Sequence, residues 1–79
     1  MLTRVIEVDL NERLVELGAR LKQMRLQKCW TLEETEQYGW KNWKHLQRIE
    51  AGKKNVTYGT IVKLSKLYDV SVAELLDGL

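Results

Sequence analysis

The sequence predicts a single all-α domain, a compact bundle of five short helices with a short extended N-terminal arm. Its 79 residues are enough for one hydrophobic core and no second layer. From Leu10 onward, apolar residues recur at spacings of three and four, as they do along one face of an amphipathic helix. Capping residues and glycines divide this pattern into short segments. We therefore expect an arm at residues 1–10 and a helical domain at residues 11–79.

The first ten residues are expected to be extended. Apolar or long side chains fall on one side of an extended chain at Leu2, Arg4, Ile6, Val8 and Leu10. A lone strand has no partner in a helical domain. The arm would therefore lie along the helices, pair with a second subunit or fray.

The first helix is predicted at residues 11–28, with Asp9 or Asn11 as its N-cap. Its apolar stripe consists of Leu10, Leu14, Leu17, Leu21 and Met24. Gly18 lies inside this helix and costs about 1 kcal/mol relative to alanine. It therefore indicates either a close backbone contact or a helix start nearer Leu17.

Two short helices follow. Thr31 caps the second, with Glu33 and Glu34 in its first turn, and this helix ends near Gly39. The third is predicted from Asn42 to Ala51, with Gly52 as its C-terminal stop. Its buried pair is Leu46 and Ile49.

The last two helices are also marked by capping residues. Thr57 caps the fourth helix, and Asp69 is expected in a left-handed turn at its end. Ser71 and Glu74 form a capping box for the fifth. Their buried positions are Ile61, Leu64 and Leu67 in the fourth helix and Val72, Leu75 and Leu76 in the fifth.

Composition indicates that the core alone stabilises the fold. Cys29 is the only cysteine and His45 the only histidine, so we expect no disulfide, no metal site and no cofactor. No apolar run approaches the roughly 20 residues of a membrane span. The N-terminus also lacks the plan of a signal peptide, so the cytoplasm is the expected compartment.

Charge is distributed unevenly along the chain. Residues 39–66 contain seven lysines or arginines and one acid, Glu50, whereas the segments on both sides are net acidic and the total is only +2. Such a block suits a surface that faces phosphate, because electrostatic affinity for DNA depends on local charge. An ordinary solvated lysine face would give the same pattern, and charge alone does not separate the two.

A series of segments resembles the phage repressor and Cro-like helix-turn-helix family, of the xenobiotic-response-element type. These segments are LGARLKQMR (17–25), TLEE (31–34), LQRIEAGKKN (46–55) and KLSKLYDVSVAELLDG (63–78). The resemblance covers about three quarters of the chain and implies a lambda-repressor-like DNA-binding domain. It also implies an ion pair between Arg25 and Glu50 that joins the first and third helices.

The resemblance makes the third helix the recognition helix, which the family places in the major groove. It places DNA contacts at Asn42, Trp43, Lys44, Gln47 and Arg48, and we add Lys41, Lys53, Lys54 and Asn55 as further DNA-binding residues. We expect Lys44, Gln47 and Arg48 to read base edges and the others mainly to hold the backbone. Trp43 would either touch a thymine methyl group or pack with the nearby tryptophans.

The chain departs from the family pattern in the second helix. Leu32 replaces the usual glutamine, which puts one contact with the DNA backbone in doubt. A one-residue shift aligns Thr35 and Gly39 with the family's small residue and glycine, keeps Glu36 in water and lets Trp40 fill an apolar position. The family also often has glycine where this chain has Cys29 and Asp69.

Other aromatic residues are given structural roles. We expect His45 to pack on the side of the third helix nearest the core. Tyr38, Tyr58 and Tyr68 are predicted at the rim of the core with hydrated hydroxyl groups.

The predicted function is that of a DNA-binding transcriptional regulator, most simply a repressor. The residues offer no paired nucleophile and base and no phosphate loop, so we expect no enzyme activity and no small-molecule substrate. The expected partners are double-stranded DNA with a palindromic operator and a second copy of the chain. A module that keeps this fold for protein interaction without binding DNA is the alternative, motivated by Leu32, the acidic second helix and the three tryptophans.

Overall fold

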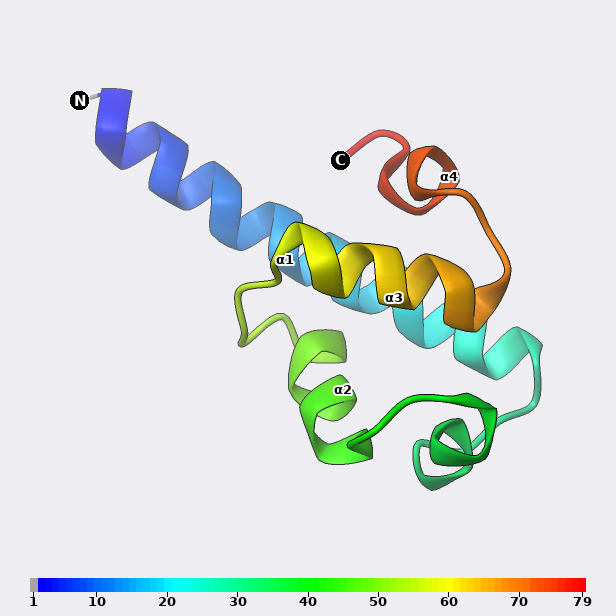
Figure 1. Ribbon diagram of the computed structural model, residues 1–79. Coiled ribbons are helices and arrows are strands. Elements are labelled where there is room, and N and C mark those ends of the chain that lie inside the picture. Colours follow the sequence, from blue (N-terminus) through cyan, green and yellow to red (C-terminus); the bar gives the residue numbers. More distant parts are fainter. Residues whose placement is uncertain (1) are drawn as a thin grey trace.

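The protein is a bundle of short helices around one long helix (Figure 1). The computed structural model describes the backbone of residues 2–79 and the side chains of residues 10–79. Its elements are α1 (Leu2–Gln27), the 3-10 helix η1 (Glu33–Tyr38), α2 (Trp43–Glu50), α3 (Tyr58–Tyr68) and α4 (Val72–Leu76). Residues 2–79 contain no strand, so the predicted all-α fold with five helices is confirmed.

Residues 2–10 were predicted as an extended arm, and this prediction is wrong. They continue α1, which runs without a break from Leu2 to Gln27. The spacing of Leu2, Ile6 and Leu10 fits a helix as well as it fits a strand. A helix satisfies its backbone hydrogen bonds internally, whereas a strand here would have no neighbour among the described residues.

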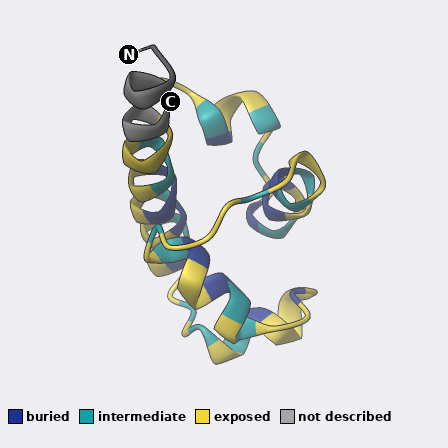
Figure 2. Ribbon diagram, turned by 90° about the vertical axis from the view of Figure 1, so that its left-hand side faces the viewer, coloured by how far each residue is buried: buried dark blue, intermediate teal, exposed yellow. Residues whose placement is uncertain are grey.

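The core lies where the helices face one another (Figure 2). Leucines and isoleucines from four helices are almost completely buried, together with one tryptophan and one tyrosine. The buried core residues are Leu17, Leu21, Trp40, Leu46, Ile49, Ile61, Leu64, Tyr68 and Leu75. The predicted pair of α2 and most of the predicted stripe of α3 point inward, with Leu67 partly buried at the edge of the core. In the predicted stripe of α1, Leu17 and Leu21 are buried, whereas Leu10 is half exposed and was wrongly placed in the core.

Tyr68 is a core residue and not the rim residue that was predicted. Only 3% of its surface is exposed, and its ring stacks on Trp30 with 6.0 Å between ring centroids. Its hydroxyl group is buried without a hydrogen-bond partner, and burial raises its pKa far above the ordinary value. Tyr38 and Tyr58 are exposed, as predicted.

The second helix is a 3-10 helix with Leu32 as its N-cap, one residue after the predicted cap Thr31, although Thr31 still bonds to its first turn. The N–H of Glu34 donates to Oγ1 of Thr31 at 3.1 Å, and the N–H of Thr31 donates to Oε1 of Glu34 at 2.9 Å. The N–H and the hydroxyl group of Thr35 both donate to the carbonyl oxygen of Leu32. This three-residue spacing is the hydrogen-bond pattern of a 3-10 helix.

Two non-glycine residues have left-handed backbone conformations at helix ends. Cys29 has φ 60° after α1, and Asp69 has φ 54° after α3. The N–H of Trp30 donates to the carbonyl oxygen of Arg25, and that of Val70 donates to Ser65, which is the bonding of a Schellman cap. The positions where the resembling family often has glycine thus have the conformation that glycine favours.

Gly18 allows α1 and α2 to approach closely. A Cβ atom at this position would lie 2.4 Å from the carbonyl oxygen of Glu50 and 2.5 Å from that of Ile49. Both atoms belong to the backbone of α2, so they cannot move aside as a flexible side chain would. The close backbone contact predicted from this glycine is therefore present, and it fixes the distance between the two helices.

Substituting Gly18 should separate α1 from α2. We expect Gly18→Ala to lower the free energy of unfolding by at least about 2 kcal/mol, because overpacking outweighs the better helix propensity of alanine. Urea unfolding would measure this change in the free energy of unfolding. Gly59→Ala is the matched control, since its Cβ would meet only the Oγ1 atom of Thr57 at 3.7 Å and should cost nothing. Equal effects at the two glycines would contradict the close contact.

Candidate nucleic-acid interface

The α2 helix has defined ends. The side chain of Asn42 is the N-cap and accepts a hydrogen bond from the N–H of Lys44 at 3.1 Å. At the other end Gly52 has φ 72°, and its N–H donates to the carbonyl oxygen of Ile49. The N–H of Lys53 donates to Arg48 at 3.1 Å, which completes a Schellman cap. The loop with Lys53 and Lys54 thus starts at a fixed position beside α2.

One face of α2 is buried and the opposite face is open. Leu46 is 0% exposed and Ile49 is 1% exposed, so this pair orients the helix. Lys44, Gln47 and Arg48 are exposed on the other face. The chain also exposes Lys41 and Asn42 directly before α2 and Lys53, Lys54 and Asn55 shortly after it, and we call these eight residues together the α2 surface.

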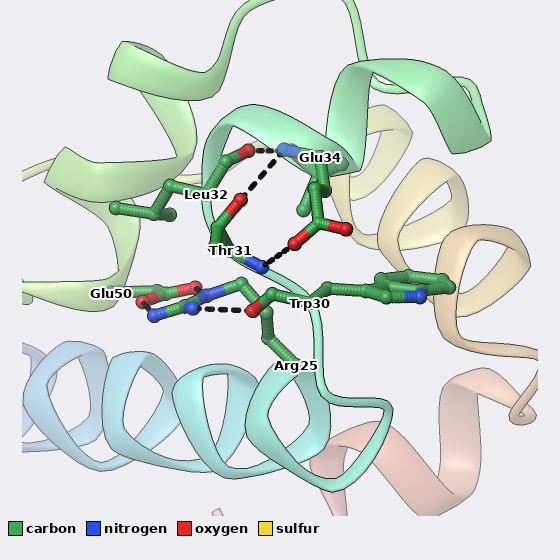
Figure 3. Close-up of polar contacts among 7 residues, drawn as sticks. Arg25, Trp30, Thr31, Leu32, Glu34 and Glu50 are labelled. Atoms are coloured by element: carbon green, nitrogen blue, oxygen red, sulfur yellow. Dashed lines mark hydrogen bonds and ion pairs between the residues drawn. The ribbon is translucent and has the colours of Figure 1, made fainter.

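Arg25 and Glu50 join α1 to the end of α2 (Figure 3). The Nε atom of Arg25 lies 2.9 Å from Oε2 of Glu50, and Nη2 lies 3.0 Å from Oε1, so the pair is bidentate. Nη1 donates to the carbonyl oxygen of Trp30 at 2.8 Å. The two side chains are only 9% and 6% exposed. The carboxylate of Glu50 raises the pKa of Arg25, because it stabilises the charged guanidinium group.

A carboxylate on η1 holds the other end of α2. Oε2 of Glu36 accepts a hydrogen bond from the N–H of Trp43 at 3.0 Å. This N–H is the first of the helix and has no partner within α2. Glu36 stays exposed, as predicted, but its bond to α2 was not predicted. The two residues are seven positions apart across a turn, and no sequence pattern gives the path of that turn.

The turn between η1 and α2 has the shifted alignment that was preferred from the sequence. Thr35 is completely buried, and Gly39 has φ 108° at the end of η1. Trp40 is 7% exposed and fills an apolar position after the glycine. Its indole N–H donates to the carbonyl oxygen of Asn42 at 2.9 Å, which ties the turn to the start of α2.

The α2 surface is positively charged and its cations are not neutralised by protein acids. The ion pairs recorded among the described side chains are Arg13–Glu16 and Arg25–Glu50. Glu50 is the one acid in residues 39–66, and Arg25 already binds both of its oxygens. The exposed cations Lys41, Lys44, Arg48, Lys53 and Lys54 therefore face solvent outside the ion pairs of the described side chains. A rigid helix with such a face suits a polyanion.

Comparison with known proteins agrees with this geometry. A family model described as "Helix-turn-helix" matches residues 21–75, which is more than half of the chain. The chain belongs to the Cro/C1-type helix-turn-helix family. This is a family of DNA-binding transcription regulators and not, in general, of enzymes. A search of curated proteins and one of solved structures found no match.

The described part of the helix-turn-helix protein has neither a cluster of metal ligands nor a membrane-spanning helix. Among the described residues no group of histidine, cysteine, aspartate and glutamate side chains could hold a metal ion. In the same part of the chain no helix is both long and apolar enough to cross a membrane.

Trp43, at the start of the second helix of the helix-turn-helix unit, is half-buried. The Nζ atom of Lys44 lies 5.9 Å from its ring centroid, within the range of a cation–π interaction. Trp30 instead stacks on Tyr38, with 4.1 Å between centroids, and Trp40 stacks on His45. Trp43 therefore takes no part in these aromatic stacks and lies partly exposed beside Lys44.

His45 packs against the core side of the helix-turn-helix unit. Its ring lies parallel to that of Trp40, with 5.9 Å between centroids. Burial lowers the imidazole pKa, and the positive charges of Lys54, Arg48 and Lys63 lower it further. The neutral ring is thus favoured in the folded protein.

Removing one partner of the buried ion pair should destabilise the fold. We expect Arg25→Ala or Glu50→Ala to lower the free energy of unfolding by about 3–5 kcal/mol, because the remaining charge is left buried without a partner. Denaturant unfolding measures the change. Glu16→Ala removes an exposed pair with 3.9 Å between its charged atoms and should cost less than about 0.5 kcal/mol. An equally small loss of unfolding free energy for Arg25→Ala would show that the buried pair does not stabilise the fold to this extent.

The titration of His45 offers a second test. Its proton NMR midpoint should lie below 6.5, and Lys54→Ala should raise it, whereas Lys22→Ala on the exposed side of α1 should not. Because the unfolded chain takes up this proton first, the free energy of unfolding should fall as the pH drops below about 6.5. A midpoint above 6.5 would contradict the environment described for this ring.

Proposed function

We propose that this protein is a sequence-specific repressor that places α2 in the major groove of double-stranded DNA. The observation that carries the proposal is the open face of α2, where Lys44, Gln47 and Arg48 project from a helix fixed at both ends. An α-helix fits the width of the major groove, and its exposed side chains reach base edges there. A rigid helix also loses little conformational entropy on binding.

The chemistry of the side chains divides the α2 surface into two roles. Gln47 suits a bidentate contact to adenine, and Arg48 suits one to guanine, while Lys44 reaches guanine or a phosphate. We assign Lys41, Lys53 and Lys54 to the phosphate backbone, with the Asn42 and Asn55 side chains as polar contacts beside them. Phosphate contacts position the protein and base contacts specify the sequence.

Trp43 and Leu32 modify this proposal. Trp43 is partly exposed and suits contact with a thymine methyl group next to the bases read by Lys44. Leu32 is half-buried and packs against the core, so it offers no hydrogen bond to the backbone. Binding to the phosphate backbone therefore depends more on the lysines that follow α2 than on the start of η1.

The proposed active form is a homodimer on a palindromic operator with half-sites about 10–10.5 base pairs apart. An eight-residue α2 contacts only a few base pairs, so two copies are needed for a selective site. Leu10 and Val15 of α1 are about half exposed, whereas Leu75 of α4 is buried and its carbonyl group is bound by Arg20. This exposure supports α1 rather than α4 as the dimer contact.

A protein-interaction module with the same fold is the alternative function. Glu33 and Glu36 are exposed on η1 and would repel phosphate placed against them. Glu36 binds the N–H of Trp43 at the start of α2, so this acid lies beside the proposed DNA contact. Binding of DNA and its dependence on salt therefore separate the two functions.

The proposed function predicts two different effects of two substitutions. After a site is selected from random duplexes, Arg48→Ala should weaken binding to it by about 1–3 kcal/mol and relax the preference at one position. Lys53→Ala should weaken selected and random duplexes alike and reduce the slope of log K against log salt by about 1. Fluorescence anisotropy at several salt concentrations measures both.

Two outcomes would contradict the proposal. Equal losses on selected and random DNA for Arg48→Ala would remove its role in base readout. Absence of duplex binding at low salt would favour the interaction module.

A further inference from the structure

A cavity lies between the turn that precedes α2 and the exposed side of α3. Its volume is about 430 Å³, within the range of about 300–1,000 Å³ that small-molecule sites have. The turn contributes Tyr38, Trp40 and Lys41, and α3 contributes Lys63, Lys66 and Leu67; Gly39, Asn42, His45 and Thr60 complete the lining. None of the side chains proposed to read bases, which are Lys44, Gln47 and Arg48, is among them.

The lining combines flat rings with positive charge. The ring of His45 stacks parallel to that of Trp40, which is itself only 7% exposed, and Leu67 adds an aliphatic wall. The indole N–H of Trp40 is already bonded to Asn42, so its ring is held in place. This wall suits the face of an aromatic ring, which gains from parallel stacking and from the burial of apolar surface.

Three ammonium groups surround this aromatic wall. Lys41, Lys63 and Lys66 are exposed, and no carboxylate belongs to the lining. None of the three forms an ion pair with an acid in the described part of the chain. Together they favour an anionic group at the mouth of the cavity, which no protein acid supplies.

We propose that this cavity binds a small aromatic anion, a flat ring that bears a carboxylate, sulfonate or phosphate group. The ring stacks in the recess formed by Trp40, His45 and Leu67. The anionic group lies among the ammonium groups of Lys41, Lys63 and Lys66. A phosphodiester of DNA would satisfy the lysines but leave the aromatic recess empty, so a small aromatic ligand fits the lining better.

The test is an NMR titration of the whole protein with 2-naphthoate. We expect saturable shifts of the His45 ring and of the backbone amides of residues 38–45 and 60–67. Two controls each lack one part of the ligand: neutral 2-naphthamide lacks the anionic group, and inorganic phosphate lacks the aromatic ring. Each should bind at least about fivefold more weakly than 2-naphthoate, which corresponds to about 1 kcal/mol.

Matched lysine variants localise the site. Lys63→Gln or Lys66→Gln should weaken 2-naphthoate by about threefold to tenfold, because each removes one charge near the anionic group. Lys22→Gln removes an exposed charge from α1 and should leave the affinity unchanged. None of these residues is buried, so the variants are expected to fold.

Five results would overturn the proposal. Equal binding of 2-naphthamide would show an apolar crevice only, and equal binding of phosphate would show a plain cationic patch. Shifts outside the cavity, or none at millimolar ligand, would exclude the site. If Lys63→Gln and Lys66→Gln weaken the binding of duplex DNA but not that of 2-naphthoate, the cavity is part of the DNA-binding surface. If the protein fails to bind DNA but binds 2-naphthoate as expected, the proposed function is wrong and this ligand site still stands.

Discussion

The attachment of α2 to α1 is the constraint on which the rest of the structure depends. An eight-residue helix is too short to be stable by itself in water, so its position must come from tertiary contacts. The bidentate bond between Arg25 and Glu50 fixes its C-terminal end, and the close approach at Gly18 fixes its distance from α1. Leu46 and Ile49 then set its rotation, because both are buried completely or nearly so.

The same contacts decide where the charge lies. Arg25 uses both oxygens of Glu50, so the one acid of the basic segment does not neutralise the lysines around it. The hydrogen bond from Trp43 to Glu36 satisfies the first N–H of α2 and places the acid of η1 at that end of the helix. The cations of α2 and of the loop after it remain exposed on one surface. Structural and electrostatic roles are thus divided between the two faces of one short helix.

Local chemistry made most of this fold predictable from the sequence. The caps at Asn42 and Thr57 and the inward pair Leu46 and Ile49 depend on residues within a few positions of each other, and all four behave as predicted. Features that depend on distant contacts were not predicted. Tyr68 is buried and stacks on Trp30 from a distant part of the chain, and Glu36 reaches the N–H of Trp43 across a turn. The helical course of residues 2–10 was missed because their spacing fits both periods.

The central claim is that the α2 surface is the part of the protein that binds DNA. The most direct measurement is a map of backbone amide shifts during titration with a duplex selected by the protein, at low and at high salt. The account predicts the largest shifts in residues 41–55 and their reversal as salt rises. Large shifts confined to η1 and α4, with residues 41–55 unchanged, would contradict it.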